Sequence, residues 1–276
     1  MIGALVIVFR EVLEAALVIG VVAAAVEGLP GRGRFVAAGI ALGIGGAALV
    51  ASAIGAISRF AGGTGQELFG AAVLCAAGLM LAWHNIWMAE HGREMTARLK
   101  SLGADVVAGR ASVAMLLVVT ALAVMREGSE IAMFLYGIAV SGVKTIPLLT
   151  GSALGLACGA AVGLVLFAGL SRVPLQRLFQ VSGAIILFIA SGMLARGIAF
   201  LVQAGDLPAL VPQVWDSSAL LSGSSLLGRS LAALVGYTPA PSLMQVLAWI
   251  ISFAAIGTLM LAKSGRFAAR RAEAAN

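Results

Sequence analysis

The chain carries the same charged motif twice, each time deep within an apolar stretch. The copies read Arg-Glu-Val-Leu-Glu at 10–14 and Arg-Glu-Gly-Ser-Glu at 126–130. On insertion scales an ionised side chain at the middle of a bilayer costs about 2.5 to 3.5 kcal/mol, so each motif costs about 7 to 10 kcal/mol before any pairing. Charges this unfavourable indicate a function, and these two motifs are where we look for it.

The spacing of the glutamates predicts a cation site. Side chains at i and i+3 share one helix face, so Glu11 lies beside Glu14. Glu127 and Glu130 are related in the same way. If the two faces meet, four carboxylates surround one point, and their hard oxygen ligands suit Mg, Ca, Mn or iron ions rather than Cu(I). Four such groups cannot all stay ionised without a cation, which leaves proton-linked transport open.

Each arginine stands four residues before the second glutamate of its motif. Arg10 can therefore lie near Glu14 and Arg126 near Glu130, where they partly neutralise the empty site. The alternative reading is an ion-pair staple between two helices, but a staple needs one acid and not two. Chance is a poor explanation, since one such motif is expected in only about one or two chains in a hundred.

Composition indicates a polytopic membrane protein. The chain is 61% hydrophobic and 11% charged, with a mean hydropathy of +1.06, values too apolar for a soluble domain. A net charge of +6 without a basic stripe and interleaved aromatics excludes nucleic acid as the expected partner. Cys75 and Cys158 lack the spacing of a disulfide framework or thiolate metal site. The N-terminus lacks a basic region, so we interpret it as a retained first helix rather than a signal peptide.

Seven stretches are long enough to cross a bilayer as helices, and we predict an all-α fold with seven transmembrane helices. They cover 2–26, 35–57, 67–89, 111–139, 146–170, 178–203 and 243–263. With the N-terminus outside, twelve Lys and Arg residues fall in inner segments and three in outer ones. The positive-inside rule therefore places the N-terminus outside and the C-terminus in the cytoplasm.

This orientation makes the two motifs antiparallel and predicts an inverted repeat of three plus three helices, with the site near the midplane. The predicted parts of this single transmembrane domain are a first repeat at 1–89, a cytoplasmic connector at 90–110, a second repeat at 111–203, an outer loop at 204–242, the seventh helix at 243–263 and a cytoplasmic tail at 264–276.

A few other polar residues were weighed as parts of the ion path. Glu67 at the outer start of the third span, and Asp206 and Asp216 in the outer loop, are candidates for gathering cations at the outer mouth. His84 and Asn85 stand between two tryptophans near the inner end of the third span. We interpret them as interfacial residues of an aromatic belt, with a role in ion exit as the alternative.

The sequence resembles the oxidase-coupled iron permeases of fungal plasma membranes and bacterial inner membranes, which carry Arg-Glu-Gly-x-Glu in helices one and four. The likeness spans nearly the whole chain, including the charged segment after the third span and the outer stretch from Trp215-Asp216 to Gly236-Tyr237 and Pro241-Ser242. It implies iron translocation, with both motifs supplying the essential residues. Val12 stands where the family has glycine, and only Asp206 and Asp216 stand where fungal members carry an acidic loop motif.

The resemblance and the Ala, Gly and Arg bias together imply a multi-pass permease of a bacterial inner membrane. Its expected partners are the lipid bilayer, the iron ion (Fe3+ or Fe2+) as cargo with no cofactor beyond it, and periplasmic or extracellular iron-handling oxidases or delivery proteins. Three rivals stay open from the residues alone: a transporter of another hard or divalent cation such as manganese or lead, a membrane-embedded metalloenzyme, and a proton-conducting or structural subunit.

Overall fold

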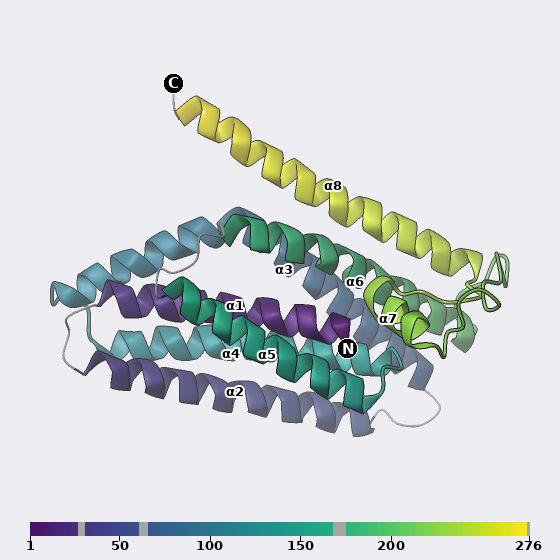
Figure 1. Cartoon of the computed structure of the whole chain (residues 1–276), viewed down its shortest axis with the longest axis horizontal. Helices are drawn as coiled ribbons and strands as arrows, with labels where there is room; N and C mark the ends of the chain where they lie inside the picture. Colours follow the sequence, from purple (N-terminus) through teal and green to yellow (C-terminus); the bar gives the residue numbers. More distant parts are fainter. Residues whose placement is uncertain (27–30, 61–65, 168–174, 275–276) are drawn as a thin grey trace.

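The structure, a computed structural model, describes residues 1–26, 31–60, 66–167 and 175–274. Within these ranges the chain forms helices and no strand, as predicted (Figure 1). The helices are α1 (Ile2–Ala25), α2 (Arg32–Phe60), α3 (Gln66–Val107), α4 (Ala114–Val140), α5 (Thr145–Phe167), α6 (Leu175–Ala204), α7 (Leu226–Val235) and α8 (Leu243–Ala274).

Five helices are long and apolar enough to cross a membrane: α2, α3, α5, α6 and α8. Helices α1 and α4, 24 and 27 residues long, are not among these five, and each carries an arginine and two glutamates near its middle. Neither is polar elsewhere, since both consist largely of Ala, Val, Leu and Ile. The chain is therefore a multi-pass membrane protein whose two charged helices need neighbours around their motifs.

Several helix boundaries differ from the predicted spans. Helix α3 continues through most of the predicted connector, and α8 continues through the predicted tail. The short α7 lies inside the predicted outer loop and was not predicted. Ser225 caps its start by accepting a hydrogen bond from Gly228 N at 2.9 Å. Gly236 ends it in the left-handed conformation, with φ of 71°.

Helix α1 lies inside the bundle and packs against α5, α4 and α3 (Figure 1). Its buried residues Ala4 and Ile7 belong to an apolar core that continues through Leu74 and Leu81 of α3 and Phe134 of α4. This position explains how a helix with three charged residues is accommodated: the charges face other helices rather than lipid.

Helices α1 and α5 make an unusually close contact along a row of glycines. A Cβ atom at Gly155 would lie 2.6 Å from the carbonyl oxygen of Leu5 and 3.0 Å from Cβ of Val8. One turn further along, a Cβ at Gly159 would lie 3.0 Å from Cβ of Val12. Small residues of this kind allow the backbones of membrane helices to approach closely.

The contact between α2 and α4 repeats this arrangement residue by residue. A Cβ at Gly43 would lie 2.8 Å from the carbonyl oxygen of Ala121 and 2.6 Å from Cβ of Val124. Counted from the arginine of its own motif, Ala121 has the same position in α4 as Leu5 has in α1. Val124 corresponds to Val8 in the same way. The two charged helices are therefore held by equivalent contacts.

The contact between α3 and α6 is reciprocal, because a glycine of each helix faces a backbone carbonyl oxygen of the other. A Cβ at Gly78 of α3 would lie 3.2 Å from the carbonyl oxygen of Ala190. A Cβ at Gly197 of α6 would lie 3.3 Å from the carbonyl oxygen of Ala71. Exchanging α1, α2 and α3 with α4, α5 and α6 thus reproduces the three main interhelical contacts.

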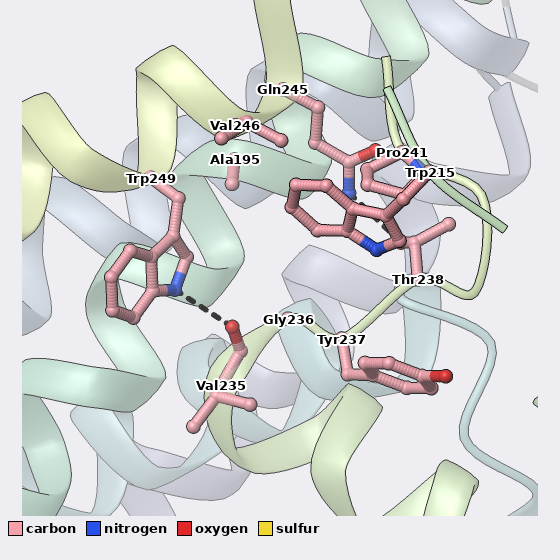
Figure 2. Close-up of a pocket in the computed structure, with 10 residues that line it drawn as sticks. All are labelled: Ala195, Trp215, Val235, Gly236, Tyr237, Thr238, Pro241, Gln245, Val246 and Trp249. Carbon is pink, nitrogen blue, oxygen red and sulfur yellow. Dashed lines mark hydrogen bonds between the residues drawn. The ribbon is translucent and has the colours of Figure 1, made fainter. Parts of the chain in front are cut away.

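The segment between α6 and α8 borders a partly open cavity of about 220 Å³, together with parts of α6, α7 and α8 (Figure 2). Trp249 Nε1 donates a hydrogen bond to Val235 O at 2.8 Å, and Gln245 Nε2 donates to Thr238 Oγ1 at 2.9 Å. Trp215 and Tyr237, conspicuous in the sequence, line this cavity. None of its lining residues is charged.

The glycine contacts predict which glycine of α2 is essential. We expect Gly43→Leu to destabilise the protein by about 1 to 3 kcal/mol, because the added side chain overlaps Val124 and the backbone of α4. Gly45→Leu is the matched control, since nothing lies within 4 Å of the position of its Cβ. Thermal unfolding of the purified protein in detergent measures both. Equal melting temperatures for the two variants would contradict the described packing.

Candidate metal centre

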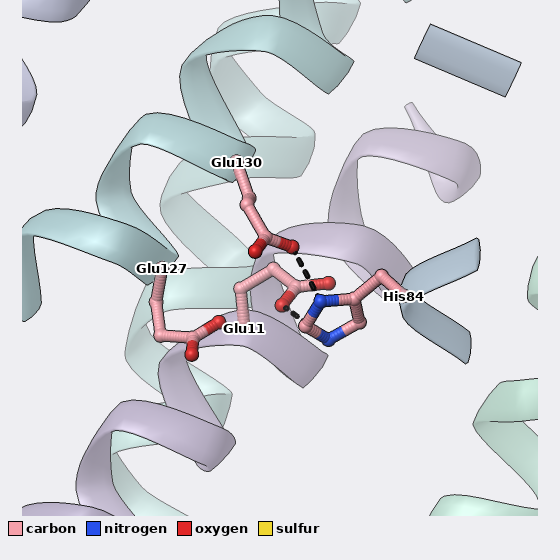
Figure 3. A group of neighbouring side chains, drawn as sticks. All are labelled: Glu11, His84, Glu127 and Glu130. Carbon is pink, nitrogen blue, oxygen red and sulfur yellow. Dashed lines mark ion pairs between the residues drawn. The ribbon is translucent and has the colours of Figure 1, made fainter. Parts of the chain in front are cut away.

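Acids from both motifs meet one histidine inside the bundle. Glu11 of α1, Glu127 and Glu130 of α4 and His84 of α3 each offer one ligand atom, and these atoms lie within 4.8 Å of one another. Figure 3 shows the three carboxylates and the imidazole pointing toward a common centre. Helices α1 and α4 run in opposite directions here (Figure 1). The structure thus brings together acids far apart in sequence, and metal binding by them stays a prediction.

Helical geometry turns the acids of α1 toward this centre and Val12 away from it. Glu11 and Glu14 are both buried, with Glu11 fully inaccessible. The side chain of Val12 packs on Gly159 of α5 instead. In the first motif the larger residue is on the motif helix, since Val12 faces a glycine. In the second motif the smaller residue is on the motif helix, since Gly128 faces the methyl group of Ala47 in α2. Val12 therefore packs against α5, away from the acids of its own motif.

Both arginines pair with the second glutamate of their motif, as the spacing indicated. Arg10 Nε lies 2.9 Å from Glu14 Oε1, and Arg126 Nε donates to Glu130 Oε1 at 3.1 Å. The environments differ: the Arg10 side chain is 2% exposed and the Arg126 side chain 38%. The Arg126 guanidinium also lies 5.0 Å over the ring of Trp87, at the distance of a cation–π contact.

His84 is a central residue of the cluster and not the interfacial residue that was predicted. Its Nε2 lies 3.1 Å from Glu14 Oε2 and 3.7 Å from Glu11 Oε2, and its Nδ1 lies 2.6 Å from Glu130 Oε2. The prediction failed because neighbours in sequence occupy different faces of a helix. Trp83 is 70% exposed, whereas His84 is only 3% exposed. A helical wheel of α3 places Trp83 and His84 about 100° apart, whereas their depth along the helix is nearly the same.

Asn85 fixes α3 at the level of His84. Its Nδ2 donates to Gly183 O of α6 at 3.0 Å and lies 3.4 Å from Met260 Sδ of α8. Like His84, Asn85 is buried. A polar side chain that joins three helices beside the acid cluster limits how far α3 can move there.

Several carboxylate oxygens at the centre are buried without a hydrogen-bond partner among the described residues. These are both oxygens of Glu11, Glu127 Oε2, Glu14 Oε1 and Glu130 Oε2. Burying a polar group without a hydrogen bond is unfavourable, and burying an unpaired charge far more so. Glu14 and Glu130 have nearby cationic partners, but the oxygens of Glu11 are 4.0 Å from Arg10 and 3.7 Å from His84. A cation bound between the acids would satisfy these oxygens.

The acids predicted at the outer mouth lie outside this cluster. Glu67 stands in the first turn of α3, and Asp206 and Asp216 lie between α6 and α7; all three are exposed. Hydrogen bonds from the side chain and backbone N–H of Ser218 hold the pKa of Asp216 below its usual value. This carboxylate therefore stays ionised in mildly acidic surroundings.

A buried acid cluster between opposed helices of a multi-pass membrane protein is typical of a protein that carries cations. The chain matches the family described as the Iron permease FTR1 family over residues 1–270. It belongs to that family, as the resemblance of the sequence indicated. Because the family consists of permeases, the chain is an iron transport protein and not an enzyme.

Curated relatives agree with this assignment. The chain is 31% identical over 255 residues to the "Ferrous iron permease EfeU" of Escherichia coli O157:H7 and to that of Shigella sonnei (strain Ss046), with 89% of this chain and 90% of each relative covered. It is also 31% identical over 254 residues to the "Putative inactive ferrous iron permease EfeU" of Escherichia coli (strain K12), with the same coverage. No solved structure matches the chain.

The unequal burial of the two arginines predicts unequal effects on stability. We expect Arg10→Met to destabilise the protein by about 3 to 5 kcal/mol, because Glu14 then stays buried without its cationic partner. Arg126→Met should cost less, since Arg126 and Glu130 are less buried. Tryptophan fluorescence during unfolding in detergent compares the two variants. A larger loss in Arg126→Met would show that the assigned burial is wrong.

Proposed function

We propose that this permease imports iron and holds the ion between Glu11, Glu14, Glu127 and Glu130. The observation that carries the proposal is the convergence of Glu11 of α1 with Glu127 and Glu130 of α4, with oxygens left unpaired. Glu14 is not in this group of four possible ligands, but it lies 3.1 Å from its histidine, His84. Carboxylate oxygens bind iron ions in either oxidation state. In the empty site Arg10 and Arg126 lower the electrostatic repulsion among the acids, and an arriving cation competes with them for Glu14 and Glu130.

The transport path we propose follows from an inverted repeat. Helices α1 to α3 and α4 to α6 form the two halves, α8 is an addition, and all seven long helices cross the membrane with the N-terminus outside. The matching glycine contacts of α1 with α5 and of α4 with α2 support the repeat. In inverted repeats the substrate lies at the interface of the halves, and here the acids of α1 and α4 occupy that interface. The excess of Lys and Arg in the inner segments supports the orientation.

The divisions of the chain follow from this topology. We assign 1–89 and 111–203 to the two repeats, 90–110 and 264–276 to the cytoplasm, 204–242 to the outer side and 243–263 to the seventh span. Most side chains of the two cytoplasmic segments lie outside the described residues. The outer segment, with its cavity, faces the side on which a periplasmic delivery protein or iron-handling oxidase would be met.

The ferrous ion is the form we propose as cargo. The relatives that cover most of this chain are named ferrous iron permeases, and their bacterial origin supports a place in the bacterial inner membrane. Other divalent cations such as manganese or lead are the second candidate, because a site rich in oxygen ligands accommodates them as well.

Uptake of iron by proteoliposomes tests the acid site. We expect Glu11→Gln, Glu14→Gln, Glu127→Gln and Glu130→Gln each to lower the initial rate at least about tenfold, because each removes a charged ligand while keeping side-chain size. Asp105→Asn is the matched control: Asp105 is an acid paired with Arg110 on the surface of α3. Normal uptake by all four glutamine variants, with normal insertion, would contradict the proposal and indicate that the acids only form ion pairs between helices.

The exposed outer acids predict a weaker and salt-dependent effect. We expect Asp216→Asn to raise the iron concentration needed for half-maximal uptake by less than about tenfold, with no change in the maximal rate. The reason is that an exposed carboxylate attracts cations without binding them at the midplane. The difference should shrink as ionic strength rises. A lower maximal rate at saturating iron would instead give Asp216 a part in translocation.

A further inference from the structure

His84 brings a nitrogen ligand into a cluster that otherwise offers only carboxylate oxygens. Its side chain is 2% exposed, and both ring nitrogens lie within 3.1 Å of carboxylate oxygens contributed by opposite halves of the bundle, Glu14 from α1 and Glu130 from α4. One of its nitrogens lies within 4.8 Å of oxygens of Glu11, Glu127 and Glu130, so an ion bound between these acids could reach it. Figure 3 shows the ring facing the same centre as Glu11 and Glu127.

We propose that His84 is a ligand of the transported ion and that its nitrogen gives the site its preference for Fe2+ over Ca2+ and Mg2+. The inference rests on the proposed function, since it requires that the acids hold an ion. It adds a specificity-determining residue that lies outside both charged motifs.

The surroundings of His84 match those of metal-binding histidines. A histidine that binds a metal through one ring nitrogen commonly donates the N–H of the other to a carboxylate, which fixes the orientation of the ring. His84 has a carboxylate on each side, so either nitrogen can bind the ion while the other donates to Glu14 or Glu130. Arg126 Nη2 lies 3.3 Å from Nδ1, beside the oxygen of Glu130.

The backbone that carries His84 is held in place by its neighbour. Asn85 ties α3 to α6 and to α8 through Gly183 and Met260. Helix α8, which lies outside the proposed repeat, thereby contributes to the position of the imidazole that the described residues bring to the site. The repeat itself supplies acids in matching pairs, whereas the nitrogen comes from one half alone.

The chemistry of the donor atoms gives the direction of the preference. Carboxylate oxygens suit Mg2+, Ca2+ and Mn2+, whereas imidazole suits iron, zinc, nickel and copper ions. A site of four carboxylates discriminates weakly between Fe2+ and the abundant hard cations. One nitrogen ligand raises the affinity for Fe2+ without raising it for Ca2+ or Mg2+.

Mn2+ bound to the purified full-length protein in nanodiscs tests the proposal directly. Electron spin echo envelope modulation detects the nitrogen nuclei of an imidazole coordinated to Mn2+. We expect this modulation in the wild-type protein and in His91→Gln, the control at the other histidine, and its absence in Mn2+-loaded His84→Gln. The spectrum of the wild-type protein tests the proposal by itself, so the test does not depend on whether a variant folds. Bound Mn2+ without nitrogen modulation in the wild-type protein would overturn the inference and leave the acid site standing.

Displacement of the bound Mn2+ tests the preference. For each protein we compare the Fe2+ concentration that displaces half of the Mn2+, under anaerobic conditions, with the Ca2+ concentration that does so, because the ratio of the two does not depend on the affinity for Mn2+. We expect this Fe2+/Ca2+ ratio to rise about tenfold in His84→Gln. It should change less in Glu127→Gln, which removes an oxygen ligand from both ions. An unchanged ratio in His84→Gln would show that His84 only positions the acids. A wild-type protein that binds no Mn2+ at all would overturn the proposed acid site together with this inference.

Discussion

Burial of the acids of α1 and α4 is the constraint on which the rest of this structure depends. Charged side chains in the middle of a membrane helix are tolerated only where other parts of the protein pair with them. Glu11 and Glu14 therefore require α1 to lie inside the bundle, surrounded by α3, α4 and α5. Once α1 is central, the acids of the opposed α4 and the imidazole of His84 are the groups within reach.

Close packing by glycine makes this burial possible. Rows of small residues in α5 and α2 let the backbones of α1 and α4 approach, with Gly155 and Gly43 in equivalent positions. The exchange between Val12 and Gly128 illustrates how the contact tolerates variation. A large residue on α1 meets a glycine of α5, while a glycine on α4 meets an alanine of α2. Complementary size across each contact, and not the identity of one residue, is what the packing requires.

Helices α1 and α4 are packed alike, but the surroundings of their motifs differ. The Arg10 side chain is buried, whereas Arg126 is partly exposed and lies over the ring of Trp87. Among the described side chains, the imidazole at the centre comes from α3, and its neighbour Asn85 is hydrogen-bonded to α6 and to α8. Two copies of one motif thus lie in different surroundings.

Local patterns in the sequence are enough to predict the all-helical fold, the long helices and the pairing of the acids with their arginines. These follow from local rules: apolar stretches of sufficient length form helices, and spacing of three or four residues places side chains on one face. The short α7 escaped prediction because its ten residues are too few to cross a bilayer, and its signals, a serine cap and a final glycine, lie in a loop between two spans. The family resemblance rested on motifs that are contiguous in the chain, which is why it could be read directly.

Which groups meet at the centre depends on the way the helices pack against one another. His84 reaches the acids because α3 crosses beside α1 and α4 at that level, and no local pattern in the sequence records a crossing point. Val12 likewise faces α5 because of how α1 is rotated within the bundle. Rotation and crossing are set by contacts between residues far apart in the chain, so a sequence read along its length fixes the chemical groups available but not their meeting place.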